Sequence, residues 1–86
     1  MTDTVRCWLV ERSLDDGRII TTRYATPDGA NEVTRQRAMG RDPEGVPVSI
    51  EVETSDLTPV DDDDMREQYH GEVTRVREEH DASDTV

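Results

Sequence analysis

The stretch VRCWLVERSLDDGRIITTRYAT, residues 5–26, places two segments rich in β-branched and aromatic residues on either side of an Asp-Gly pair at residues 16–17. Such segments favour strands. Asp-Gly favours a two-residue type I′ turn, because both central positions of that turn need positive φ and these two residues adopt it readily. The stretch therefore predicts a β-hairpin in which Leu9 lies opposite Tyr24.

This hairpin also puts Trp8 opposite Ala25, and successive side chains of a strand point to opposite faces of the sheet. One predicted face collects Val5, Cys7, Leu9, Ile20 and Tyr24. The other predicted face collects Arg6, Trp8, Val10, Arg12, Leu14, Ile19 and Arg23.

A helix is predicted between Thr26 and Gly40. Thr26 or Asp28 can cap its N-terminus, and Gly40 stands where a left-handed C-terminal residue is favoured. Pro27 suits the first helical turn. The apolar stripe of this segment is thin and consists of Ala30, Val33 and Ala38.

Residues 46–53 alternate between apolar and polar side chains, which predicts a half-buried strand. Pro47 cannot donate a hydrogen bond to a neighbouring strand, so an edge position is favoured. The apolar side of this strand consists of Val46, Val48, Ile50 and Val52.

Residues 62–80 predict an amphipathic helix, because their apolar side chains recur every three or four positions and share one narrow stripe. The stripe consists of Met65, Tyr69, Val73, Val76 and His80.

The aspartates Asp61 to Asp64 stand at the start of this helix. Asp61 or Asp62 can cap the first backbone N–H groups, and the carboxylates meet the positive end of the helix macrodipole. Consecutive helical side chains point about 100° apart, so at most two of these carboxylates could share one ion. We interpret the run as a helix start rather than a specific metal site, and leave weak cation association open.

Together these elements predict an α+β two-layer sandwich with the order β-β-α-β-α. The three-stranded mixed sheet has the order 2-1-3, and both helices lie on one face. They cover the face that carries Val5, Leu9 and Ile50, and the face that carries Trp8 stays open. Residues 1–80 form a single domain, and residues 81–86 form a flexible acidic tail.

The charge balance is strongly acidic, with 21 Asp and Glu residues against ten Arg, no Lys and a net charge of -11. This composition resembles that of the cytosolic proteins of salt-accumulating halophilic archaea; an ordinary acidic protein or a partly disordered one is the alternative. Residues 1–41 carry a net charge of +1 and residues 42–86 a net charge of -12, so an anion-binding surface is expected in the first half. The chain has no long apolar stretch and no signal-peptide pattern, which predicts a soluble cytoplasmic protein without a membrane partner.

Catalytic chemistry finds little support in the sequence, and we expect neither an enzyme nor a cofactor. Cys7 is the single cysteine and is expected to be buried and inert. His70 and His80 are ten residues apart and do not form a ligand pair. No glycine-rich phosphate loop and no G-x-S-x-G motif occurs.

The predicted open face is the one candidate site, because it combines an indole with arginines. Such a mixture occurs in protein interfaces and in sheets that stack single-stranded bases. We expect a non-enzymatic protein–protein interaction module that binds a partner or a second copy of itself in a homodimer. The expected binding residues are Arg6, Trp8, Val10, Arg12 and Arg23.

The alternative is a nucleic-acid-associated or regulatory protein that contacts phosphate through arginines of the first half. The net negative charge and strong salt both oppose that alternative. In addition, Glu51 and Glu53 are expected on the same face as Arg6 and Arg12, where they can neutralise them. The arginines of this alternative are Arg6, Arg12, Arg23, Arg35, Arg37 and Arg41.

Overall fold

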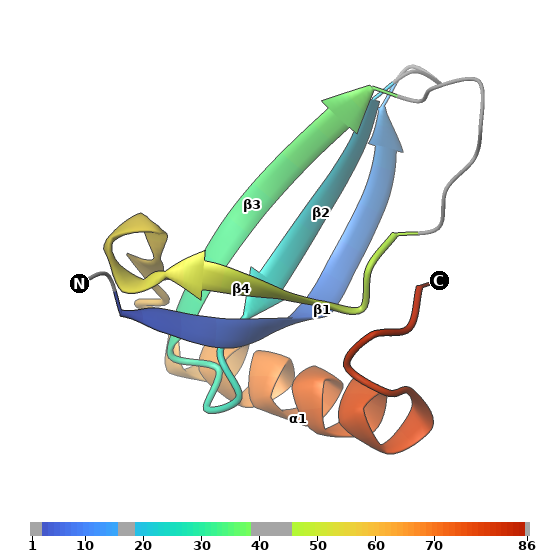
Figure 1. The fold of residues 1–86 in the computed structure, drawn as a ribbon. Coiled ribbons are helices and arrows are strands. Elements are labelled where there is room, and N and C mark those ends of the chain that lie inside the picture. The colour runs from blue at the N-terminus through green and yellow to red at the C-terminus, as the bar shows by residue number, and fades with distance from the viewer. Residues whose placement is uncertain (1–2, 16–18, 39–45, 86) are drawn as a thin grey trace.

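The computed structural model describes residues 3–15, 19–38 and 46–85, which form an antiparallel sheet of five strands with one helix against it (Figure 1). The strand order across the sheet is β4-β1-β2-β3-β5. The strands are β1 (Thr4–Asp15), β2 (Ile19–Ala25), β3 (Asn31–Ala38), β4 (Ser49–Glu53) and β5 (Thr58–Pro59). A 3₁₀ turn, η1 (Thr54–Asp56), follows β4, and the helix is α1 (Asp63–Glu79).

The predicted fold class is wrong. The sheet is antiparallel throughout and is not a three-stranded mixed sheet, and the described residues form one α-helix instead of two. The error lies in residues 31–38, which form β3 beside β2 rather than a crossover helix. Without that crossover nothing imposes a parallel pair of strands.

Thr26 and Asp28 shape a tight turn between β2 and β3 instead of capping a helix. The Gly29 backbone N–H donates to the Thr26 carbonyl at 2.8 Å, and the Ala30 N–H donates to Asp28 Oδ1 at 3.0 Å. Gly29 has a φ of 73°, in the left-handed region that favours glycine. The chain therefore reverses within a few residues and returns as a strand.

The predicted hairpin register is confirmed at the end far from the turn, where Leu9 pairs with Tyr24 and Trp8 with Ala25. Nearer the turn the pairing is Asp15 with Ile19, so one residue more than expected separates the two strands. A β-bulge between Leu9 and Glu11 absorbs that extra residue. The predicted Asp-Gly turn at residues 16–17 lies outside the described residues.

The first half of β1 pairs with β4, from Thr4 opposite Glu53 to Trp8 opposite Ser49. Beyond the bulge, β1 turns away from β4 and continues along β2, so the sheet curls (Figure 1). The three consecutive strands β1, β2 and β3, with β4 returning beside β1, have the spatial order of a Greek key.

Helix α1 matches the predicted amphipathic helix closely. Asp62 is its N-cap, with a side chain that accepts from the Asp64 N–H, and His80 is its C-cap. Tyr69 and Val73 are buried, and Met65 and Val76 pack at the edge of the same cluster. The capping role expected for Asp61 or Asp62 is therefore confirmed for Asp62.

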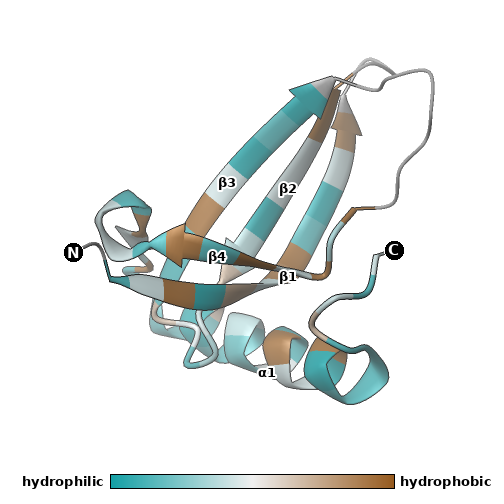
Figure 2. Ribbon diagram, in the orientation of Figure 1, coloured by the Kyte–Doolittle hydropathy of each residue, from teal (hydrophilic) through white to brown (hydrophobic). Residues whose placement is uncertain are grey.

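The helix covers the face of the sheet that we expected to stay open. One core cluster lies between α1 and the sheet and contains Trp8, Ala25, Val48, Val60, Tyr69 and Val73. A second cluster lies on the opposite face and contains Cys7, Tyr24, Val33 and Val52. Figure 2 shows that most of α1 and the upper part of β3 are hydrophilic, as expected where an element turns to solvent.

Residues 82–85, which we expected in a flexible tail, are hydrogen-bonded to the segment that enters β4. The Val48 N–H donates to the Asp84 carbonyl at 3.0 Å, and Ser49 Oγ donates to the Ala82 carbonyl at 2.6 Å. Thr85 forms an isolated antiparallel bridge with Pro47. In the part of the chain described, no helix is long and apolar enough to cross a membrane.

Candidate functional site

Trp8 is buried beneath α1, with 8% of its surface exposed. The guanidinium carbon of Arg77 lies 5.7 Å from the centroid of its ring, at cation–π distance. Since the indole packs against the helix, it offers no open platform to a partner. Val10 lies at the bulge and packs at the edge of the same cluster.

Arg6 lies opposite Glu51 in the pairing of β1 with β4 and forms an ion pair with it at 3.2 Å. Its second terminal nitrogen donates to Ser49 Oγ at 2.8 Å. The expected neutralisation of Arg6 by Glu51 is therefore confirmed. Glu53 lies opposite Thr4, whereas Arg12 lies beyond the part of β1 that pairs with β4.

Arg23 ties the sheet to the helix rather than facing solvent. One terminal nitrogen donates to Glu11 Oε2 at 2.9 Å and to the Tyr69 hydroxyl at 3.1 Å. The hydrogen bond to Tyr69 is the main cause that raises the pKa of the guanidinium. The Arg23 Nε is buried and has no hydrogen-bond partner among the described residues, an exception to the usual pairing of buried donors.

Arg12 lies on the opposite face from Trp8, because the bulge reverses the alternation of β1. A single inserted residue sends every later side chain of a strand to the other face. Arg12 pairs with Thr22, and Thr22 pairs with Arg35, so the three residues form one row across β1, β2 and β3. The five predicted binding residues are therefore divided between two faces.

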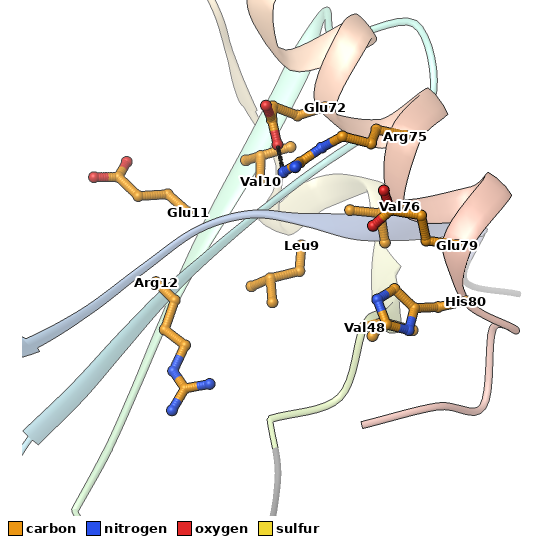
Figure 3. A pocket seen from close by; sticks show the side chains of 10 residues that line it. All are labelled: Leu9, Val10, Glu11, Arg12, Val48, Glu72, Arg75, Val76, Glu79 and His80. Atoms are coloured by element: carbon orange, nitrogen blue, oxygen red, sulfur yellow. Dashed lines mark hydrogen bonds and ion pairs between the residues drawn. The ribbon is translucent and has the colours of Figure 1, made fainter. Parts of the chain in front are cut away.

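A pocket of about 210 Å³ lies on the helix side, where β1 leaves β4 (Figure 3). Its apolar walls come from Leu9, Val10, Val48 and Val76, and its rim carries both acidic and basic side chains. Arg75 and Glu72, one turn apart on α1, form an ion pair at 2.7 Å on the helix side of this pocket, whereas Arg12 points away from α1 (Figure 3). The paired, mixed charges give this pocket no preference for a ligand of one sign.

A second pocket, of about 310 Å³, lies on the sheet face opposite α1, and we call it the arginine pocket. Arg35 and Arg37 are two residues apart on β3 and point to this same face. The pocket is lined by Thr22, Tyr24, Arg35, Arg37, Val46, Pro47, Ile50 and Glu51.

The arginines around this pocket are free of ion pairs within the described part of the chain. Arg35 and Arg37 are exposed, and so is Arg12 at the other end of the row through Thr22. None of the three takes part in the ion pairs formed among residues 3–15, 19–38 and 46–85. Guanidinium groups that are not engaged in ion pairs can bind a carboxylate or a phosphate.

The floor of the arginine pocket is apolar and its polar groups are occupied. Tyr24 is 2% exposed and donates its hydroxyl hydrogen to the Pro47 carbonyl at 2.7 Å. Burial raises the pKa of Tyr24, so the phenol keeps its proton at neutral pH. Glu51, the acid on the rim, is held by Arg6.

Cys7 is buried in the cluster beneath the pocket with no exposed surface, as predicted. Burial raises the pKa of its thiol, against a smaller opposing effect of the Arg35 charge. A thiol with a raised pKa carries little of the reactive thiolate at neutral pH.

From the sequence, we expected Arg35 and Arg37 to bind phosphate only if the protein were nucleic-acid-associated. Their neighbourhood was missed because residues 31–38 were expected to be helical, which would have separated them from Tyr24 and Thr22. The signal that could have found it is their spacing of two residues, which places both on one face of a strand.

No curated protein and no solved structure matches the chain. One family model matches residues 1–86. The chain therefore belongs to the family of unknown function DUF7967.

Proposed function

We propose that this protein is a non-enzymatic interaction module whose arginine pocket binds an acidic segment of a partner protein. The proposal depends on one observation: Arg12, Arg35 and Arg37 lie exposed on one face without ion pairs among the described residues. The burial of Trp8 moves the proposed surface from the face we first expected to the face opposite α1.

The chemistry of the pocket favours carboxylates accompanied by aliphatic groups. Guanidinium groups donate charge-assisted hydrogen bonds to carboxylates, and these are stronger than hydrogen bonds between neutral groups. Val46, Pro47 and Ile50 supply apolar surface beside Arg35 and Arg37. A segment that carries carboxylates beside aliphatic or small side chains satisfies both parts of the pocket.

A nucleic acid ligand has less support, because no aromatic side chain is available to stack on a base. The chain has one Trp, two Tyr and no Phe. Trp8, Tyr24 and Tyr69 are each at most 8% exposed. Stacking on aromatic side chains is the main means by which proteins bind single-stranded bases.

Catalysis also has less support than binding. The titratable groups that line the pocket besides its arginines are Tyr24, which keeps its proton, and Glu51, which is paired with Arg6. The acidic composition leads us to place the module in a salt-rich cytoplasm, where apolar contacts and close charge pairs act together.

Fluorescence anisotropy with labelled acidic peptides tests this function at low and at molar salt. A peptide of alternating Glu and Val is expected to bind, and its Gln counterpart is not. Arg35→Gln and Arg37→Gln should each weaken binding by about tenfold, the loss of one hydrogen bond to a charged group. Arg75→Gln is the matched control, since it removes the same charge from an exposed ion pair on α1.

Equal binding of the Glu and Gln peptides would contradict the proposed function. A single-stranded RNA that binds the protein while the acidic peptide does not would instead support the nucleic-acid alternative. Both outcomes can be read from the same titration.

A further inference from the structure

The outer edge of β3 is open beside the arginine pocket. Strand β5 pairs with β3 only at Asn31 and Glu32, opposite Pro59 and Thr58. From Val33 to the end of β3, no other described strand pairs with this edge. An open edge presents unpaired N–H and C=O groups that can pair with another chain.

Another open edge, on β1 beyond the bulge, is a poorer candidate than the edge of β3. The bulge at Val10 interrupts the strand there, which is one of the ways in which proteins protect an edge. The adjoining helix-side pocket carries charges of both signs, with Arg75 already paired to Glu72. This edge therefore selects no particular partner.

The side chains along the free part of β3 define the partner. Arg35 and Arg37 point to the pocket face, whereas Thr34 and Gln36 point to the other face. In a paired strand, directly opposed side chains interact, and opposite charges stabilise the pair whereas like charges destabilise it. A second copy pairing through this same edge would bring its own arginines against Arg35 and Arg37, which argues against self-association here.

We propose that the acidic segment binds as an added strand on the outer edge of β3, with carboxylates at alternate positions against Arg35 and Arg37. The intervening positions carry small polar side chains such as Thr, which meet Thr34 and Gln36. This inference rests on the proposed function and adds its mode of binding: backbone hydrogen bonds supply affinity, and the two arginines supply specificity.

N-methylated peptides test this mode, because N-methylation removes a backbone donor without changing charge. A peptide of alternating Glu and Thr is compared with two versions, methylated either at the Glu or at the Thr nitrogens. In an added strand one of these two sets of N–H groups faces β3 and the other faces solvent. One version should bind at least tenfold more weakly, and the other should bind within about threefold of the parent.

Amide hydrogen exchange of the protein supplies a second measurement. The parent peptide is expected to slow exchange at outward N–H groups in residues 33–37, while exchange in α1 stays unchanged. A peptide of the same composition with its Glu residues grouped at one end should bind more weakly than the alternating one.

Two results separate the failure of this inference from the failure of the proposed function. If all three peptides bind equally and depend on Arg35 and Arg37, the pocket binds carboxylates without strand addition, and only the inference is overturned. If no acidic peptide binds, both proposals are overturned, and Arg35 and Arg37 serve to keep other strands away from the edge.

Discussion

Gly29 joins the two layers at the point where the turn between β2 and β3 meets α1. Its φ of 73° disfavours any other residue, and a Cβ there would collide with the backbone carbonyl of Arg66 and lie 2.9 Å from the His70 nitrogen. The adjoining Pro27 carbonyl lies 2.9 Å from His70 Nδ1. The missing side chain thus allows the turn to rest directly on the helix.

Gly29→Ala should therefore lower the stability of the protein markedly. The left-handed conformation alone costs a non-glycine residue about 1–2 kcal/mol, and the backbone collision adds to that. Such a loss lowers the melting temperature of a domain of this size by about 4–16 °C. Thermal unfolding followed by circular dichroism measures the change.

Gly71→Ala is the matched control for this substitution. Gly71 is exposed within α1, and a Cβ there meets no atom within 4 Å. Alanine should stabilise the protein by about 0.5–1 kcal/mol, because it favours a helix more than glycine does. A Gly29→Ala protein that melts at or above the wild-type temperature would contradict the proposed packing of the turn.

The bulge at Val10 sets the limit on predicting individual site residues from alternation. Alternation correctly placed Cys7 and Leu9 on one face and Trp8 on the other. Beyond the bulge it placed Arg12 on the wrong face, because one inserted residue inverts the pattern. No residue type in this part of β1 marks the insertion, so only the pairing with β2 reveals it.

Among the elements, the contrast between α1 and β3 shows what patterning can predict. Helix α1 has a regular apolar stripe and an aspartate cap, so local preference and packing agree. In β3 the buried Val33 is followed by the exposed residues 34–37, which supply neither a helical stripe nor a buried strand face. Pairing with the edge of β2 makes this segment a strand, and the sequence of the segment alone does not reveal that pairing.

The residues before β3 misled the prediction for a related physical reason. Thr26 and Asp28 are favoured as helix caps because their side chains accept hydrogen bonds from nearby backbone N–H groups. The same property stabilises the turn, where Asp28 Oδ1 accepts from Thr26 Oγ1 at 2.5 Å and from the Ala30 N–H at 3.0 Å. Cap chemistry and turn chemistry therefore cannot be separated by residue type alone.

The start of α1 offers a prediction at the scale of the element. Asp62 Oδ1 accepts from the Asp64 N–H at 2.9 Å, whereas the neighbouring Asp61 is exposed and forms no hydrogen bond with a described residue. Asp62→Ala should destabilise the protein by about 1 kcal/mol, the usual cost of losing an N-cap. Urea unfolding measures this free energy.

Asp61→Ala removes the same charge without removing the cap and serves as the comparison. It should leave the stability unchanged or raise it slightly, since it reduces the net negative charge. Equal losses for the two variants would show that charge at the helix start matters and that the Asp62 hydrogen bond does not.

At the scale of the whole molecule, the aspartate run and the two arginines of the arginine pocket lie on different sides of the sheet. Helix α1 and its N-terminal aspartates lie on one side, and Arg35 and Arg37 line the pocket on the other. The sequence showed this division only as a net charge of +1 for residues 1–41 and -12 for residues 42–86. Under the proposed function, this arrangement would orient an acidic partner toward the arginine pocket.

The remaining prediction concerns the net charge of -11, which should make stability depend on salt. Repulsion among the acids destabilises the compact state, and salt screens it: the Debye length falls from about 30 Å at 0.01 M to about 3 Å at 1 M. Salt also weakens the four Arg–carboxylate ion pairs formed among the described residues, but exposed pairs of this kind contribute little stability. The melting temperature should therefore rise steadily from millimolar to molar KCl.

A charge-reduced variant separates screening from other effects of salt. Asp61→Asn, Glu67→Gln and Glu78→Gln together reduce the net charge from -11 to -8, and all three side chains are exposed without an ion pair among the described residues. If repulsion is the cause, the variant melts higher than the wild type in dilute buffer, and the two converge in molar KCl. If both proteins instead gain the same number of degrees, salt acts by strengthening apolar burial. A wild-type melting temperature that does not change with KCl would exclude a role for its acidic surface in adapting the fold to salt.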